Sequence, residues 1–97
     1  MAAALRVSDL LPVGRKNAIT GDKLCAALNC NTRQLIAAIN RERKAGAPIC
    51  ASCADPRGYY LAEDPEELDA YLLSFTGRVK DMEAARDGMQ TARNGMT

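Results

Sequence analysis

Histidine and tryptophan are absent from this sequence, and three tyrosines and one phenylalanine are its aromatic residues. Without histidine, a serine or cysteine nucleophile lacks the base that usually activates it. Gly14, Gly21 and Gly46 stand alone, so the chain has no glycine-rich loop of the kind that binds phosphate groups. We therefore expect a protein that is not an enzyme and that needs no cofactor.

Long apolar runs are also missing, and none is long enough to span a lipid bilayer. The opening residues, MAAALRVSDLL, are interrupted by charged side chains too early for a signal peptide. We therefore expect a cytoplasmic protein without a membrane partner. In that compartment the four cysteines should be mostly reduced.

The cysteines form two pairs, a C-x4-C pair at Cys25 and Cys30 and a C-x2-C pair at Cys50 and Cys53. Four thiolates can bind zinc, and each spacing is tolerable. We expect no metal site, because the two pairs fall on elements that should lie apart in the fold. Packing as small apolar side chains explains Cys25 and Cys50 instead.

Charge is nearly balanced, with a net value of +1 over 97 residues, but it is unevenly distributed. Residues 31–46 carry four basic side chains and one acidic one, whereas residues 47–67 carry one basic and five acidic ones. Local fields of this kind matter more for choosing a partner than the net value does.

The basic stretch, residues 31–46 (NTRQLIAAINRERKAG), is predicted as one helix. Asn31 is a good N-cap, and Gln34 stands where a capping box requires Glu or Gln. Gly46 suits a helix C-terminus, and Pro48 prevents continuation. These signals fix both ends of the helix.

Within this helix, Leu35, Ile36 and Ile39 fall at helical spacing and predict a narrow buried stripe. The remaining faces carry basic and amide side chains. Arg pairs with guanine edges or phosphates, and Asn or Gln pairs with adenine, so such a face suits the groove of a DNA duplex.

The neighbouring segments complete a recognisable order. A short helix is expected within residues 5–11, a brief extended piece at Ala18 and Ile19, and a second helix over residues 21–28 capped by Thr20. Strands are expected over residues 48–51 and 59–61, joined by the turn formers of residues 52–58. Two helices joined by a short turn and followed by a hairpin place the second helix where DNA is read.

This sequence resembles winged helix-turn-helix domains of the biotin-repressor N-terminal type, which also occur in small bacterial and phage proteins. The resemblance covers residues 5–62 and is carried by Ile39 together with residues 20–24 (TGDKL), 31–35 (NTRQL), 46–49 (GAPI) and 58–61 (GYYL). One departure is Glu42, where the family usually has an apolar core residue. Either this carboxylate lies at the edge of the core or the helix is rotated slightly.

The resemblance and the basic helix together predict double-stranded DNA as the partner. Base-edge contacts are expected near the start and along the outer side of the helix, and phosphate contacts from the flanks. Arg43 is a further candidate for phosphate contact. The predicted DNA-binding residues are Thr32, Arg33, Gln34, Ala37, Asn40, Arg41, Lys44, Arg57, Arg15 and Lys16.

A last helix should begin at Asp64 and Pro65 and continue to about Met89, with a frayed tail after it. Its apolar residues recur every four and three positions, which suits either packing on the core or a homodimer through the helix over residues 68–89. Residues 1–62 would then be the winged helix-turn-helix domain, and residues 63–97 the C-terminal helix.

The predicted fold class is therefore mainly α with a small β-hairpin, a winged helix-turn-helix plus a long C-terminal helix. The predicted function is sequence-specific duplex binding, as a transcriptional regulator or a phage replication accessory. The alternative is a protein–protein interaction module on the same scaffold, favoured by the acidic residues 55–67 and by a hairpin with one basic residue, Arg57.

Overall fold

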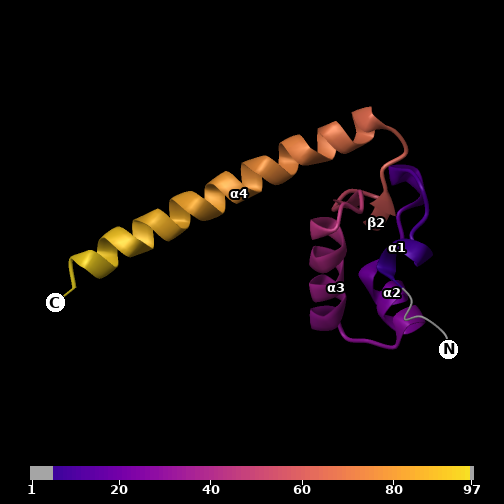
Figure 1. Cartoon of the computed structure of the whole chain (residues 1–97), viewed down its shortest axis with the longest axis horizontal. Coiled ribbons are helices and arrows are strands. Elements are labelled where there is room, and N and C mark those ends of the chain that lie inside the picture. The colour runs from indigo at the N-terminus through magenta and orange to yellow at the C-terminus, as the bar shows by residue number, and fades with distance from the viewer. Residues whose placement is uncertain (1–5, 97) are drawn as a thin grey trace.

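A computed structural model describes residues 6–96 of the chain. A small domain is followed by one long helix that projects away from it, so the molecule measures 54 × 34 × 25 Å (Figure 1). The elements in chain order are α1 (Val7–Leu10), a 3-10 turn η1 (Arg15–Asn17), α2 (Gly21–Leu28), α3 (Thr32–Lys44), β1 (Ile49–Ser52), β2 (Gly58–Leu61) and α4 (Pro65–Asn94).

Helices α2 and α3 form a helix-turn-helix pair whose ends are set by local capping. The Thr20 hydroxyl accepts a hydrogen bond from the Lys23 N–H and begins α2. Asn29 takes a left-handed conformation (φ 52°) after α2, and the Cys30 N–H donates to the Cys25 carbonyl at 3.0 Å. Asn31 then caps α3. The chain therefore reverses in three residues, as the sequence predicted.

Strands β1 and β2 form an antiparallel hairpin with Ile49 opposite Leu61 and Ser52 opposite Gly58. Ile19 adds an isolated bridge to Tyr59, with hydrogen bonds of 2.8 and 2.9 Å in both directions. Gly58 has φ 130°, and a Cβ there would overlap the Ile19 carbonyl. The predicted extended piece at Ile19 is confirmed, and glycine is required where it meets the hairpin.

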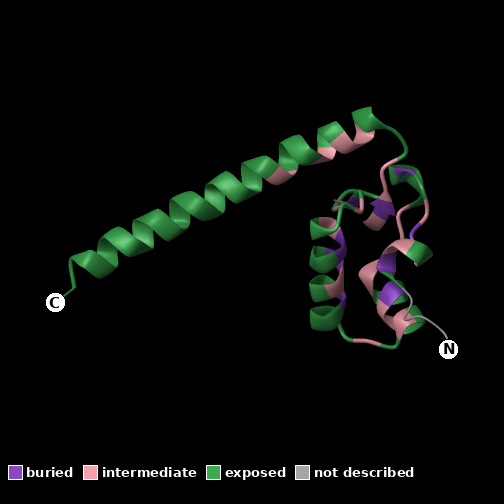
Figure 2. Ribbon diagram, in the orientation of Figure 1, coloured by how far each residue is buried: buried purple, intermediate pink, exposed green. Residues whose placement is uncertain are grey.

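The core lies between α1, α2, α3 and β1 (Figure 2). From α3 it receives Leu35 and Ile39, as predicted, but Ile36 is 47% exposed. The helix is rotated relative to the predicted stripe, so that its buried side is Leu35, Ile39 and Glu42. The prediction that Ile36 is buried was wrong, because three apolar residues on one helix do not say which two of them the neighbouring helices cover.

Helix α1 has four residues and depends on α3 for its N-terminal cap. The Glu42 carboxylate accepts hydrogen bonds from the N–H groups of Val7 (2.7 Å) and Ser8 (2.9 Å). The predicted segment also included Leu5, which lies outside the described residues. Glu42 is 8% exposed, so it replaces an apolar core residue by fixing two backbone donors that α1 itself cannot satisfy.

Helix α4 begins as predicted, with the Asp64 carboxylate accepting from the Glu67 N–H at 2.8 Å and Pro65 in the first turn. It continues to Asn94, five residues past Met89. The predicted fraying after Met89 was therefore wrong for residues 90–94. Leu68, Tyr71 and Phe75 are half-buried against the domain, and every residue from 76 to 96 is exposed.

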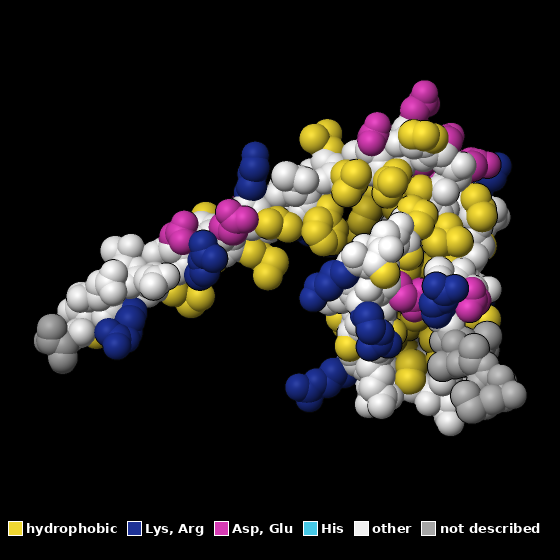
Figure 3. Space-filling view, in the orientation of Figure 1, with side chains coloured by type: hydrophobic (Ala, Val, Ile, Leu, Met, Phe, Trp, Pro, Cys, Tyr) yellow, Lys and Arg dark blue, Asp and Glu magenta, His cyan; other side chains and the backbone are white. Residues whose placement is uncertain are grey.

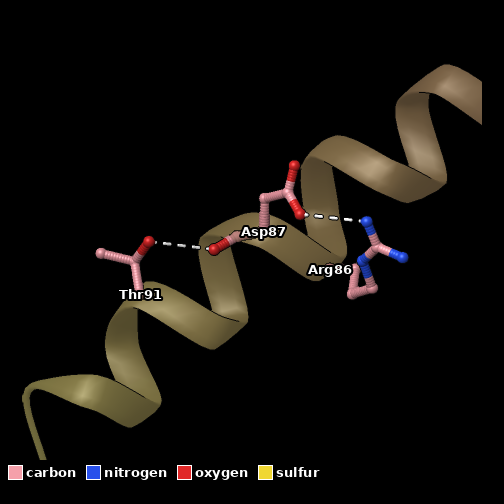
Figure 4. A network of polar contacts seen from close by, with 3 residues as sticks. All are labelled: Arg86, Asp87 and Thr91. Carbon is pink, nitrogen blue, oxygen red and sulfur yellow. Dashed lines mark hydrogen bonds and ion pairs between the residues drawn. The ribbon is translucent and has the colours of Figure 1, made fainter.

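Among the residues that the structure describes, the polar side-chain contacts at the exposed end of α4 lie within the helix itself (Figure 4). Arg86 pairs with Asp87 at 3.3 Å, and the Thr91 hydroxyl donates to the Asp87 carbonyl at 3.0 Å. Both partners in the ion pair are 68% exposed, so the pair contributes little to stability.

The structure therefore confirms the predicted fold class: mainly helical, with a two-stranded antiparallel hairpin and a long C-terminal helix. Within residues 6–96, none of the helices combines the length and the apolar character needed to cross a membrane.

Candidate nucleic-acid interface

The outward side of α3 is the main candidate surface. At about 100° per residue, Arg33, Ala37, Asn40 and Lys44 lie on the side opposite Leu35 and Ile39. All four are exposed. Lys and Arg side chains project along the outer edge of this helix in Figure 3. The small Ala37 at the middle of this side leaves the backbone accessible to a partner surface.

The single acidic residue of α3 is turned away from this surface. Glu42 points into the domain and is occupied by the N–H groups of α1. The outward side of α3, a helix that the structure describes in full, therefore carries basic and amide side chains without a carboxylate. A negatively charged backbone approaching this side meets attraction without local repulsion.

The start of α3 is closed by a reciprocal cap. Asn31 Oδ1 accepts from the Gln34 N–H at 2.8 Å, and Gln34 Oε1 accepts from the Asn31 N–H at 3.0 Å. The capping oxygen of Gln34 is thus occupied, while its amide nitrogen is the part that can donate to a partner. The sequence predicted both the cap and a binding role for Gln34, and the geometry limits that role to donation.

Arg57 approaches the start of α3 from the loop between β1 and β2. It lines a shallow hollow of about 280 Å³ together with Thr32, Asp22 and Tyr59. The structure thus brings together two predicted residues, Thr32 and Arg57, that are 25 positions apart. Asp22 in the same hollow reduces the net positive charge there.

Arg41 lies on the opposite flank of α3, beside a groove of about 630 Å³ that Gln34 and Arg6 also line. Glu42 closes the inner wall of this groove. Arg41 is exposed and adjoins the outward side, so it can reach a phosphate beside a groove-bound α3.

Arg15 and Lys16 do not join the α3 surface. They lie on the 3-10 turn and line a separate hollow with Glu63 and Glu67. The Arg15 N–H contacts Glu67 Oε2 at 3.4 Å. Nearby carboxylates offset their charge, which weakens them as phosphate ligands.

Arg43, the other candidate for phosphate contact, joins α3 to the rest of the chain instead. Its Nε donates to the Ile49 carbonyl and its Nη2 to the Tyr71 hydroxyl, both at 3.0 Å. Its guanidinium lies 5.5 Å from the ring centroids of Tyr71 and Phe75. These contacts engage two of its five N–H donors, hold the guanidinium against the two rings and couple the end of α3 to α4.

The roles of Glu42 and Arg43 were not predicted from the sequence. A carboxylate three residues after Ile39, on the apolar side of the helix, is the one available signal, since a buried charge needs partners. The partners of Glu42 lie 34 and 35 residues away, and Tyr71 lies 28 residues from Arg43. Sequence spacing could not identify partners at such distances.

The cysteines occupy three different settings: Cys25 and Cys30 are half-buried, Cys50 is buried and Cys53 is exposed. Burial raises the pKa of the Cys50 thiol, and burial together with neighbouring Cys25 raises the pKa of Cys30. These thiols are therefore protonated at neutral pH. Over residues 6–96, no three His, Cys, Asp or Glu side chains come close enough to hold a metal ion together.

Comparisons of the chain with protein-family models, with curated proteins and with solved structures gave no match.

Proposed function

We propose that this protein binds double-stranded DNA without catalysing a reaction, by placing α3 in the major groove. The observation that carries the proposal is the charge sorting on α3, in which the one carboxylate is buried under α1 and the outward side is basic. A helix with this side fits the width of the major groove and offers side chains that pair with base edges.

The contacts divide by position. Thr32, Arg33, Ala37 and Asn40 lie where a groove-bound helix meets base edges, and Lys44 and Arg41 lie where phosphates pass. Arg57 would meet the backbone beside the start of α3, as the wing of a winged helix does. Arg15 and Lys16 are the weakest candidates, because Glu63 and Glu67 share their hollow.

Duplex binding is tested by fluorescence anisotropy, first with a random-sequence duplex and then with a duplex selected by the protein. For wild type, the logarithm of the association constant should fall steeply and linearly with the logarithm of salt concentration. Arg33→Ala and Arg41→Ala should weaken binding. A lost phosphate contact reduces the salt slope by about 0.9, and a lost base contact costs about 1–3 kcal/mol of discrimination.

The matched control is Lys80→Ala, which also removes one positive charge but from the exposed part of α4. It should leave the affinity and the salt slope nearly unchanged. If the Arg33 and Arg41 variants bind a selected duplex as tightly as this control does, the assigned surface is wrong. If wild type shows no binding even at low salt, the proposal as a whole fails.

The second candidate is a protein-binding module on the same scaffold. The specific observation in its favour is an exposed acidic set that would repel a duplex: Asp55 in the hairpin loop, and Glu63, Asp64 and Glu66 at the start of α4. This alternative predicts no duplex binding together with a protein that co-purifies with the chain.

A regulatory or replication-accessory role in a bacterium or phage, in the cytoplasm, is the setting in which we place duplex binding. Occupancy of a selected site in cells, followed by transcription and replication assays on that site, distinguishes the two roles.

A further inference from the structure

The chain exposes more surface than a molecule of its mass needs to. Its accessible area is 7308 Å², whereas a compact monomer of 10.4 kDa exposes about 5,400 Å². Its radius of gyration is 16.4 Å, against about 12.5 Å for a compact domain of this length. The excess area, roughly 1,900 Å², is larger than the share that one partner contributes to a standard protein interface.

Helix α4 leaves the domain after Phe75, and every residue from 76 to 96 is exposed. A single exposed helix is marginally stable in water, and Gly77 and Gly88 each cost about 1 kcal/mol relative to alanine. Met82, Met89 and Met96 are nevertheless 72%, 69% and 69% exposed. Apolar side chains along a helix that lacks tertiary contacts indicate that another surface covers them.

These apolar residues form one continuous seam with a heptad repeat. Positions of type d are Leu68, Phe75, Met82 and Met89, and positions of type a are Leu72, Val79, Arg86 and Arg93; Met96 follows the end of the helix. The seam is apolar at its start, where Leu68 and Phe75 meet the domain, and it then runs unaccompanied along the projecting part (Figure 3). Its period is that of a coiled coil.

We infer that the partner on this seam is a second copy of the chain, packed antiparallel as a two-stranded coiled coil. The two arginines decide the direction. In a parallel pair, Arg86 would face Arg86 and Arg93 would face Arg93 across the seam, placing like charges opposite each other in two layers.

In an antiparallel pair centred between residues 80 and 81, each layer combines an a position with a d position of the other copy. Arg93 then faces Leu68, Arg86 faces Phe75, Met89 faces Leu72 and Met82 faces Val79. Each arginine stem thus covers an apolar side chain while its guanidinium reaches water. No layer pairs two arginines of the seam, and at the Phe75 layer Arg86 would join Arg43 and Arg78, whose guanidinium groups lie 5.5 and 5.3 Å from that ring centroid.

The residues that flank the seam are complementary in the same register. On one flank, the bulky Arg78 and Tyr71 face Ala85 and Ala92 of the other copy. On the other flank, Glu83 faces Thr76, and Asp69 faces Gln90. Large residues therefore meet small ones, and no like charges meet, whereas moving the register by one heptad toward the C-terminus places Glu83 opposite Glu83.

This register brings the C-terminal half of the other copy's helix against the domain at the start of α4. A groove of about 250 Å³ lies between the end of α3, the start of β1 and α4, and its lining includes Pro48, Leu68, Leu72 and Phe75. In the antiparallel pair, Met89 of the other copy meets Leu72 at this groove. The far half of that helix carries Ala85 and Ala92 beside the seam, and their small side chains allow a close approach.

Small-angle X-ray scattering combined with light scattering tests both parts of the inference on the unmodified protein. The mass should be that of a dimer. Each domain begins about 23 Å from the two-fold axis at 1.5 Å per residue, so the two domains are about 47 Å apart. The distance distribution should show two maxima and extend well beyond the 54 Å of one chain.

Met82→Glu tests the seam directly, because it places a carboxylate in it. Ala84→Glu is the matched control, because it adds the same group on the same turn but away from the seam. Both residues are exposed in the single chain, so neither change disturbs the domain. Met82→Glu should raise the dimer dissociation constant at least about 100-fold, because each dimer would bury two carboxylates. Ala84→Glu should leave it within a few-fold of wild type.

A monomer at every accessible concentration overturns the inference. A dimer whose distance distribution has a single maximum and extends no further than one chain overturns the antiparallel direction. An unchanged dimer dissociation constant in Met82→Glu overturns the assignment of the seam as the interface. Duplex binding is not part of this test, so either proposal can fail while the other stands.

Discussion

Replacing Glu42 by glutamine should destabilise the domain while leaving its shape unchanged. The carboxylate accepts from Val7 N–H at 2.7 Å and from Ser8 N–H at 2.9 Å, and it is 8% exposed. An amide of the same size can accept one of these bonds with its oxygen, but its NH2 group faces the other N–H donor. In the variant, one hydrogen bond therefore becomes a bond to a neutral acceptor, and the other backbone N–H is left without an acceptor.

Each part of this loss can be given a magnitude. A hydrogen bond to a charged group contributes about 1.5–3 kcal/mol, and a buried donor without a partner costs about 1–3 kcal/mol. Because α1 is short and its end can partly reopen to water, we expect a loss of about 2–3 kcal/mol. A domain of this size has about 5–10 kcal/mol in total, so the effect is a large fraction of its stability.

Urea unfolding followed by far-UV circular dichroism, at one fixed protein concentration, measures this loss. The midpoint should fall while the slope of the free energy against urea is unchanged. Asp81→Asn is the matched control, because it makes the same carboxylate-to-amide change at an exposed site on α4, and it should stay within about 0.5 kcal/mol of wild type. If Glu42→Gln is as stable as this control, the carboxylate does not hold α1 to α3.

Two further predictions concern the hairpin. Gly58→Ala should lower the free energy of unfolding in urea by about 3 kcal/mol or more, because the added Cβ would overlap the Ile19 carbonyl. The control is Gly46→Ala, which also has positive φ (105°) but no atom within 4 Å of the added Cβ, and it should cost about 1 kcal/mol. Equal losses in the two variants would contradict the close approach at Gly58. The pKa values of Cys50 and Tyr60 are raised above 9.0 and 10.0, chiefly by burial, so the unfolded chain releases these protons first and the free energy of unfolding should fall as pH rises through this range. Unfolding at pH 7 and pH 10 measures the fall, which should be smaller in Cys50→Ala; no difference between that variant and wild type would show that the thiol does not contribute.

Local signals in the sequence determined where α2, α3 and α4 begin. Thr20, Asn31 and Asp64 each stand at a predicted N-cap and each accepts the capping hydrogen bond. The turn at residues 29–31 and the hairpin also lie where the sequence predicted them. These features depend on side chains within a few residues of the backbone groups that they satisfy, so sequence spacing is enough to find them.

The sequence also determined the composition of the candidate surface, but not its arrangement. Arg33, Ala37, Asn40 and Lys44 share one side of α3 because helical spacing requires it. Whether Arg15 lies near them depends on where the chain passes after α1, and the structure places it beside Glu63 and Glu67 instead.

Only the tertiary structure decided which side of α3 is buried and what its end contacts. Ile36 is exposed and Glu42 is buried because α1 supplies two N–H donors that need a carboxylate. These donors lie 34 and 35 residues from Glu42 in the sequence. Arg43 is held by Ile49 and Tyr71, which the sequence gives no means of pairing with it. Caps and turns satisfy the backbone locally, whereas burial is settled by whichever distant segment packs on a helix.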